Sequence, residues 1–272
     1  MKHLYRILFV IAILSSSCSK LIPLTEVPKT AKLISGTEVN VLLFRDSTSS
    51  DHKMIQMAVD YAANNDYTGV FVPDGEYNID AAGVNGEMGI LLKSNLHLRL
   101  ADNAILKAIP NNVGTYYILR AHNLENLKIS GGKIMGERTA HIGTTGEWGM
   151  GIDLRNTRNV KIENVYISNC WGDGIYIGKG SNYNVQIDGV VSDNNRRQGM
   201  SITSADSILV VNSKFKNTNG IAPHAGIDLE PNTGSSVKNV EVFNCEFSNN
   251  LGRGFDIVGL TGNISYVTLD SC

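Results

Sequence analysis

The tetrapeptide Gly151-Ile152-Asp153-Leu154 belongs to a phrase that recurs along the second half of the chain. Its related copies are Gly174-Ile175-Tyr176-Ile177, Gly199-Met200-Ser201-Ile202, Gly226-Ile227-Asp228-Leu229 and Gly254-Phe255-Asp256-Ile257. Successive glycines are 23, 25, 27 and 28 residues apart, and a repeat of this length is typical of a solenoid. Inside each copy the apolar residues alternate with other residues, which is the spacing of a β-strand.

Two further phrases recur in the same period. The first reads Asn126-Leu127-Lys128-Ile129, Asn159-Val160-Lys161-Ile162, Asn184-Val185-Gln186-Ile187 and Asn239-Val240-Glu241-Val242, with Ser207-Ile208-Leu209-Val210 as a looser copy. The second ends at Asn169, Asn194, Asn217 and Asn249. Three short strands per period predict the coils of a parallel β-helix, stacked about 4.8 Å apart. A single coil cannot bury its own apolar face, so neighbouring coils must do so.

The turn residues agree with this interpretation. In register, Asn169, Asn194, Asn217 and Asn249 would stack as a ladder of amide groups. The alternative for this row is a line of sugar-binding side chains. The glycines that open each copy of the first phrase suit a corner that needs either a positive φ or a close approach of two backbones.

The start of the chain has the layout of a secretory signal over residues 1–17, with basic residues before an apolar run from Ile7 to Leu14. Small residues then precede Cys18, and this arrangement resembles a bacterial lipoprotein signal. The resemblance implies cleavage before Cys18, lipid attachment to its sulfur, and anchoring in the bacterial cell envelope. The alternative is ordinary secretion. Residues 18–40 are predicted to be a tether.

Residues 51–63 are predicted to form an amphipathic helix, with an apolar face of Met54, Ala58, Tyr61 and Ala62. Thr48, Ser49 and Ser50 offer N-caps. This helix would cover the otherwise open edge of the first coil. The predicted fold class is therefore all-β: a single-stranded right-handed parallel β-helix over residues 41–272 with an N-terminal capping helix. No capping element is evident in the sequence at its other end.

The helix followed by Val70-Phe71-Val72-Pro73-Asp74-Gly75-Glu76-Tyr77 resembles the opening of the pectate-lyase and polygalacturonase-like β-helix superfamily. Residues 96–100 and 104–108 look like its early coils. The resemblance implies the fold, and it implies polysaccharide as the partner of many members, which are lyases, hydrolases or epimerases. Other members are phage tail fibres or adhesins, so the fold does not establish an activity. The Asn-Thr-Asp, Asp-Asp, Gly-His-Gly and Arg-Ile-Lys set of polygalacturonases is absent. The sequence also lacks the pectate-lyase motifs and the Asp-Pro-His motif of the epimerases.

The composition limits the classes of partner that this protein could bind. The chain of 272 residues has a net charge of −2 and a pI of about 6.3, so it offers no basic field for nucleic acid. Cys170 and Cys245 lie three coils apart by the repeat, beyond the reach of a disulfide. Cys272 aligns with Cys245 on the next coil, either as stacked thiols or as a bridge.

Outward positions of the first strand form a predicted row of Asp153, Tyr176, Ser201, Asp228 and Asp256. Together with Glu230, two of these carboxylates, Asp228 and Asp256, should converge on adjacent coils. Carboxylates so close either raise one another's pKa or bind Ca²⁺. Glycosidases use such a pair, one protonated and one charged. The alternative is a solvated acidic face.

The corner before that strand supplies the other half of a possible site. Arg197 and His224 are predicted to be neighbours on successive coils, and a uronate lyase needs a base and a cation of this kind. His224 is the candidate base, Arg197 the carboxylate clamp and Arg196 its support. The alternatives are a surface corner paired with Asp173 or Asp193, and an ordinary loop histidine.

The leading hypothesis is an enzyme, a lyase or hydrolase of a uronate-containing polysaccharide, in which His224, Asp228 and Arg197 are catalytic. The predicted substrate-binding residues are Arg196, Asp173, Tyr176, Glu230, Asp256, Asp153 and Trp148. Trp148 lies in the longest loop and would offer a platform for a sugar ring, whereas Trp171 is expected to pack in the corner. The rival hypotheses are a non-catalytic glycan-binding or structural surface protein and a tail-fibre-like trimer.

Overall fold

The computed structural model describes residues 38–84, 88–259 and 261–272. The predicted signal, Cys18 and most of the predicted tether lie outside these residues. Within them, every helix is too short or too polar to span a bilayer.

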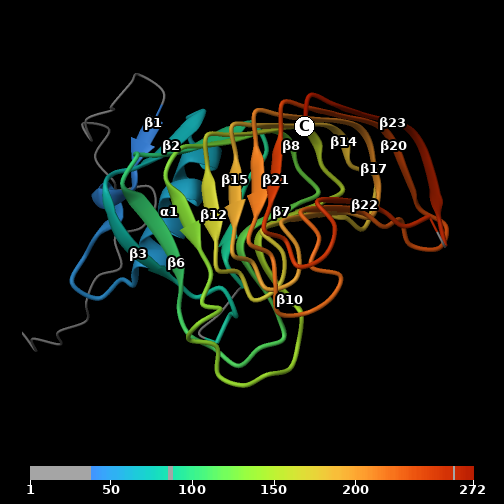
Figure 1. Ribbon diagram of the computed structural model, residues 1–272. Coiled ribbons are helices and arrows are strands. Elements are labelled where there is room, and N and C mark those ends of the chain that lie inside the picture. Colours follow the sequence, from blue (N-terminus) through green and yellow to red (C-terminus); the bar gives the residue numbers. More distant parts are fainter. Residues whose placement is uncertain (1–37, 85–87, 260) are drawn as a thin grey trace, which may run out of the picture. The chain divides into compact units, whose positions relative to one another are not determined.

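The described residues form three parallel sheets (Figure 1). The first contains β1 (Glu38–Asn40), β2 (Gly69–Val72), β5 (Leu96–Leu100), β8 (Glu125–Ser130), β11 (Arg158–Glu163), β14 (Tyr183–Asp188), β17 (Ala205–Val211), β20 (Ser236–Phe243) and β23 (Asn263–Asp270). The second contains β4 (Ile90–Leu91), β7 (Thr115–His122), β10 (Trp148–Arg155), β13 (Ile175–Gly178), β16 (Met200–Ile202), β19 (Ile227–Leu229) and β22 (Phe255–Ile257). The third contains β3 (Gly75–Ile79), β6 (Ala104–Ala108), β9 (Lys133–Met135), β12 (Tyr166–Ser168), β15 (Val191–Asp193), β18 (Lys214–Lys216) and β21 (Glu246–Ser248).

From β2 to β22 the chain visits the three sheets in turn, so each of these coils contributes one strand to each sheet, and this confirms the predicted parallel β-helix. Side chains in register form continuous columns inside the coils. One fully buried column in the first sheet consists of Val70, Leu98, Ile129, Ile162, Ile187, Val210 and Val242. The hydrophobic effect therefore stabilises each coil only while its neighbours are in place.

The predicted capping helix is α1 (Asp51–Asn64), and the Ser50 hydroxyl caps it by accepting from the Lys53 amide at 3.2 Å. Its predicted apolar face is buried and packs against β1 to β4. The β-helix begins slightly earlier than the sequence indicates. β1 starts at Glu38, inside the segment expected to be a tether, and a short 3₁₀ helix over Val41–Phe44 follows it.

The glycines that open the first-strand phrases are required by close approach and not by a positive φ. A Cβ on Gly199 would lie 2.4 Å from the carbonyl oxygen of Gly226, and a Cβ on Gly226 would lie 2.4 Å from that of Gly254. Neither glycine has a positive φ. At Gly199 and Gly226 the backbones of successive coils therefore touch, and a side chain would not fit there.

Asparagines adopt the left-handed conformation instead. Asn126, Asn159 and Asn184 have φ values of 56°, 54° and 55°, and each donates through its side-chain amide to the asparagine of the preceding coil at 2.8–2.9 Å. Asn tolerates this backbone and the bonded amides link the coils. The ladder predicted over Asn169, Asn194, Asn217 and Asn249 is wrong in extent.

In that predicted row only the first two asparagines are bonded to each other, at 2.6 Å. The amide of Asn217 donates to Asp193 instead, and the Asn194 oxygen accepts from Arg138. Among the cysteines that the structure describes, all are free thiols, and the Cys245 amide donates to the Cys272 sulfur at 3.4 Å.

We predict that Gly226→Ala lowers the free energy of unfolding by about 1–3 kcal/mol, because its methyl group collides with the backbone of the next coil. The matched control is Gly259→Ala, where the nearest atom to the new methyl group is 3.8 Å away. Urea denaturation followed by circular dichroism measures both. Equal midpoints for the two variants would contradict the close-approach interpretation.

Candidate active site

The predicted outward row exists, because Asp153, Tyr176, Ser201, Asp228 and Asp256 pair in register along the second sheet. All five are buried, with exposed fractions of 0–8%. The alternative of a solvated acidic face is therefore wrong for Asp228 and Asp256, whereas the side chain of Glu230 is 44% exposed. A buried carboxylate must be neutralised, hydrogen-bonded or protonated, and the neighbours of each one determine which of these occurs.

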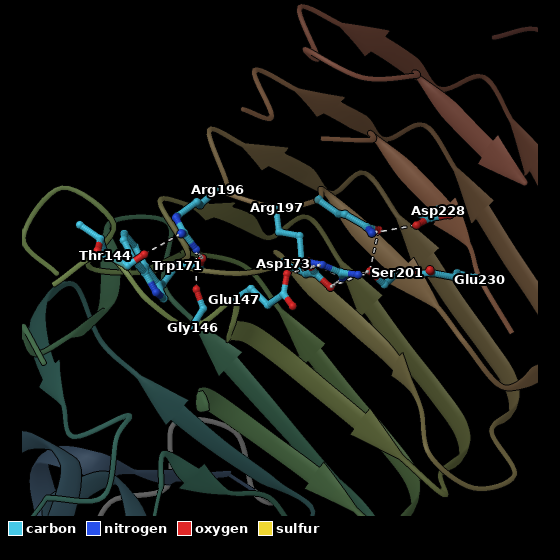
Figure 2. A network of polar contacts seen from close by, with 11 residues as sticks. Thr144, Gly146, Glu147, Trp171, Asp173, Arg196, Arg197, Ser201, Asp228 and Glu230 are labelled. Carbon is cyan, nitrogen blue, oxygen red and sulfur yellow. Dashed lines mark hydrogen bonds and ion pairs between the residues drawn. The ribbon is translucent and has the colours of Figure 1, made fainter. Parts of the chain in front are cut away.

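Arg197, at the corner before β16, neutralises the fully buried Asp173 (Figure 2). Its Nη1 donates to the two carboxylate oxygens at 3.3 and 3.1 Å and to the Ser201 hydroxyl at 3.3 Å. Burial raises the pKa of Asp173, and Arg197 opposes this rise. Arg197 therefore neutralises a carboxylate of this protein itself.

Two further carboxylates, both more exposed than that of Asp173, lie at the other edge of the Arg197 guanidinium. Glu230 Oε2 lies 3.5 Å from Nη2, and Glu147 Oε2 lies 3.7 Å from Nε. Burial disfavours the charge on Arg197, but Asp173, Glu230 and Glu147 together outweigh it and raise the arginine pKa. The side chains of Glu230 and Glu147 are 44% and 35% exposed, so solvent or a ligand can reach both.

Among the buried carboxyl groups of this row, Asp228 is the one that forms no ion pair with the described residues. Gln198 Nε2 lies 2.8 Å from its Oδ2, and its Oδ1 is buried with no hydrogen-bond partner. Burial, followed by the nearby charges of Glu230 and Asp256, raises the pKa of Asp228 from 3.8 to about 7. Near neutral pH this carboxyl group therefore exists in both protonation states, as an acid–base catalyst requires.

The remaining carboxylates of the row have cationic partners. Arg253 Nη1 donates to Asp256 at 2.9 Å, and the Ile257 amide donates to the other Asp256 oxygen at 3.0 Å. In the described part of the chain, no group of three or more His, Cys, Asp or Glu side chains is arranged to hold a metal ion. Asp228, Glu230 and Asp256, for which Ca²⁺ binding was one alternative, are therefore not such a group, and Asp256 is paired with Arg253.

A second polar cluster surrounds Asp153, and the sequence analysis missed part of it. Arg155 Nε lies 2.8 Å from Asp153 Oδ2, and His122 Nε2 contacts the same oxygen. Arg120 Nε donates to His122 Nδ1 at 3.1 Å, so the ring proton lies on Nε2 and points at Asp153. Both ring nitrogens are engaged, and His122 is therefore held as a structural partner of Asp153.

This cluster was missed because Ile118 stands where the other coils have the opening glycine. A search anchored on glycine therefore skips the coil that carries β7. The second phrase offers a signal that would have found it, because Asn126 follows Leu119 at the same distance as Asn159 follows Ile152.

His224 forms no polar side-chain contact with the other predicted site residues. It precedes β19 with a φ of 60°, and its carbonyl accepts from the Gly252 amide of the next coil at 3.1 Å. Its side chain makes no hydrogen bond or ion pair with the described residues. The Gly199 amide donates to the Ala225 carbonyl at 3.0 Å, so His224 lies beside the corner that carries Arg197, on the next coil. No hydrogen bond or ion pair joins the two side chains, and the catalytic role of His224 stays a prediction.

Arg196 and Trp171 hold the loop over residues 136–147 in place. Arg196 donates to the carbonyls of Gly146 and Thr144 at 2.7 and 3.2 Å, and its guanidinium stacks 3.8 Å above the Trp171 ring (Figure 2). His141 stacks on the same tryptophan, also at 3.8 Å. Arg196 is thus engaged with the loop, and its predicted substrate-binding role stays a prediction. The expected packing of Trp171 is confirmed, since this residue is 7% exposed.

Tyr176 and Trp148, the two aromatic residues predicted to contact a substrate, differ in their exposure to solvent. Tyr176 is 8% exposed and its hydroxyl lies 2.9 Å from Thr203 Oγ1, so it is a packing residue. Trp148, at the start of β10, is 49% exposed and can offer its face to a sugar ring.

These features define a solenoid protein with a buried row of ionisable side chains along one sheet. Residues 63–268 match the family described as the right handed beta helix region, and the chain belongs to this family. Among curated proteins, the uncharacterized protein YclG of Bacillus subtilis is 31% identical over 231 residues. That match covers 76% of this chain but only 39% of YclG, so the chain spans about two fifths of its relative.

Two solved structures share the fold. The tailspike protein gp49 of the Acinetobacter baumannii bacteriophage Fri1, a capsular polysaccharide depolymerase, is 15% identical with a TM-score of 0.64, over 88% of this chain and 51% of that one. The family 28 exopolygalacturonase of Yersinia enterocolitica is 15% identical with a TM-score of 0.57, over 84% and 57%. The expected resemblance to the polygalacturonase-like superfamily is thereby confirmed at the level of fold.

We predict that Asp228→Asn removes a pH dependence of stability. The folded protein holds the Asp228 proton up to about pH 7, whereas the ordinary pKa is 3.8. The stability that this proton confers is present below pH 3.8 and is lost as the pH rises to about 7.

The side-chain amide of the variant has no proton to release. As the pH rises from 3.8 to about 7, the free energy of unfolding of Asp228→Asn should therefore increase relative to that of the wild type, by about 1.4 kcal/mol for each unit of pKa difference. Above about pH 7 the difference should be constant. Urea denaturation at a series of pH values measures it, and parallel curves for the two proteins would refute the assigned pKa.

Proposed function

We propose that this protein hydrolyses glycosidic bonds of a polysaccharide, with Asp228 as the general acid. The observation that carries the proposal is the Asp228 carboxyl: its Oδ1 has no partner and its pKa is raised to about 7 by burial and like charges. Glycoside hydrolysis needs a carboxyl group that is still protonated near neutral pH beside a second, ionised carboxylate. Glu230, which follows β19 on the same coil, is the candidate for that second group.

Hydrolysis fits this site better than elimination. A lyase needs a base and a cation free to neutralise a uronate carboxylate. The His224 side chain has no hydrogen bond or ion pair with the described residues, and Arg197 is outnumbered by Asp173, Glu147 and Glu230. The excess of negative charge disfavours a uronate at this position, so we expect the sugar bound beside Asp228 to be neutral. Trp148 is the candidate platform for a neighbouring sugar.

We predict that Asp228→Asn and Glu230→Gln each reduce the release of reducing ends by about 100-fold or more, the usual contribution of a general acid or base. The control is Glu246→Gln, an exposed carboxylate on the third sheet that pairs with Lys214. A panel of neutral and uronate polysaccharides serves as substrate. Full activity in both site variants would exclude the proposed roles.

The same panel separates hydrolysis from elimination, because only elimination yields an unsaturated uronate that absorbs near about 235 nm. Reducing ends without this absorbance support the hydrolase. Absorbance that rises with product would show a lyase instead.

Non-catalytic glycan binding is the second candidate function, because Asp228 has an exposed fraction of 0% while Trp148 is open to solvent. A substrate can reach Asp228 only if covering side chains move. Binding to a glycan array with no product from any bound glycan, and loss of that binding in Trp148→Ala, would establish this function.

We also propose that the protein is exported and anchored through a lipid on Cys18, on the basis of the basic, apolar and small-residue order of residues 1–17. Expressed in a bacterium with the complete sequence, the wild type should incorporate radiolabelled palmitate and sediment with membranes. Cys18→Ser should do neither. Equal labelling of both proteins would rule out this anchor.

A further inference from the structure

Two buried side chains, Ser201 and Gln198, link the carboxyl groups of Asp173 and Asp228 in an unbroken row of four (Figure 2). Ser201 Oγ lies 2.6 Å from Asp173 Oδ2 and 2.6 Å from Gln198 Oε1. The amide nitrogen of Gln198 lies 2.8 Å from Asp228 Oδ2. The exposed fractions of the four residues are 0% or 1%.

The hydrogens of this row do not suffice if both carboxyl groups are ionised. A serine hydroxyl has one proton, and neither an amide oxygen nor a carboxylate oxygen has any to donate. Ser201 has such an oxygen 2.6 Å away on each side. With both acids ionised, one of these two short contacts would bring together two oxygen lone pairs without a proton, which is costly in a buried site.

One additional proton bridges every contact, in either of two arrangements. If the Gln198 nitrogen faces Asp228, Ser201 donates to the Gln198 oxygen and Asp173 must carry the proton. If the amide is turned over, its nitrogen donates to Ser201, Ser201 donates to Asp173, and Asp228 must carry the proton. The oxygen and nitrogen of a glutamine amide occupy nearly the same positions, so the heavy atoms fit both arrangements.

We infer that Asp173 and Asp228 hold a single proton between them, and that the Gln198 amide, through Ser201, determines which of the two carries it. Gln198 and Ser201 are thus positioning residues for the protonation of Asp228. The inference rests on the contacts alone and holds whether or not the protein is a hydrolase.

The surrounding charges place the proton on Asp228. Arg197 pairs directly with Asp173 and stabilises its ionised form, although Glu147 also lies nearby. Asp228 faces the carboxylates of Glu230 and Asp256, and Arg197 acts on it without direct contact. Arg253 pairs with Asp256. The second arrangement therefore has the lower electrostatic energy.

Carbon-13 NMR of aspartate carboxyl groups, titrated with pH and assigned with Asp228→Asn, tests the coupling. In Ser201→Ala the amide is released and can turn its nitrogen to Asp228, which stabilises the carboxylate. The titration midpoint of Asp228 should therefore fall by about one unit or more. Ser201→Thr keeps the hydroxyl and should restore the wild-type midpoint.

The matched control is Ser192→Ala, which removes another fully buried hydroxyl, bonded to the Gly199 carbonyl at 2.8 Å, from the third sheet. It should leave the Asp228 midpoint unchanged even if it lowers stability. An unchanged midpoint in Ser201→Ala, or an equal shift in Ser192→Ala, would overturn the inference.

Neutron diffraction from wild-type crystals gives a second test that does not depend on the folding of a variant. At a pD one unit below the Asp228 midpoint, we expect deuterium on Asp228 Oδ2 and the Gln198 nitrogen facing Ser201. Deuterium on neither carboxyl group, or the amide nitrogen facing Asp228, would refute the assignment. Loss of glycan cleavage plays no part in either test, so failure of the proposed function leaves this inference standing.

Discussion

The contact between successive coils at the glycine corner is the constraint on which the rest of the structure depends. Backbones there approach so closely that a single methyl group on Gly226 would lie 2.4 Å from a carbonyl oxygen. This approach keeps strands that are about a coil apart in sequence at the ordinary strand spacing. The register that follows makes columns of Ile, Leu and Val inside the coils and bonded rows of asparagine at their turns.

The same register sets the electrostatic problem of the site. Stacking places Asp228 directly beside Asp256 on the next coil, and both are buried. Like charges so close in a poorly solvated place need compensation. Asp153 obtains it from Arg155 and His122, Asp173 from Arg197, and Asp256 from Arg253. Asp228 has an amide where the others have a cation, and its raised pKa follows from that difference.

The long loop before β10 links this chemistry to the surface. Arg138, within the loop, donates to the Asn194 carbonyl, and Arg196 donates to the Gly146 carbonyl of the loop. Trp171 is stacked between Arg196 and His141. Side chains that looked suited to a ligand thus hold the loop, and the loop in turn brings Glu147 to Arg197. The site is completed by a segment outside the repeat. A shared fold with polysaccharide-acting proteins therefore says little about which residues act here.

The coil, its period and its capping helix could be predicted from the sequence, because burial imposes a regular alternation of apolar residues and close packing imposes glycine at a recurring position. The neighbours Asp228 and Asp256 followed from the same register. Pairing of Arg197 with Asp173 was one of the alternatives that the sequence left open. The contacts of Arg197 with Glu147 and Glu230 and those of Arg196 with the loop did not follow, because turns of unequal length shift the residues between the strands. Only the folded chain determines where those side chains point, since their contacts depend on loops that no repeat describes.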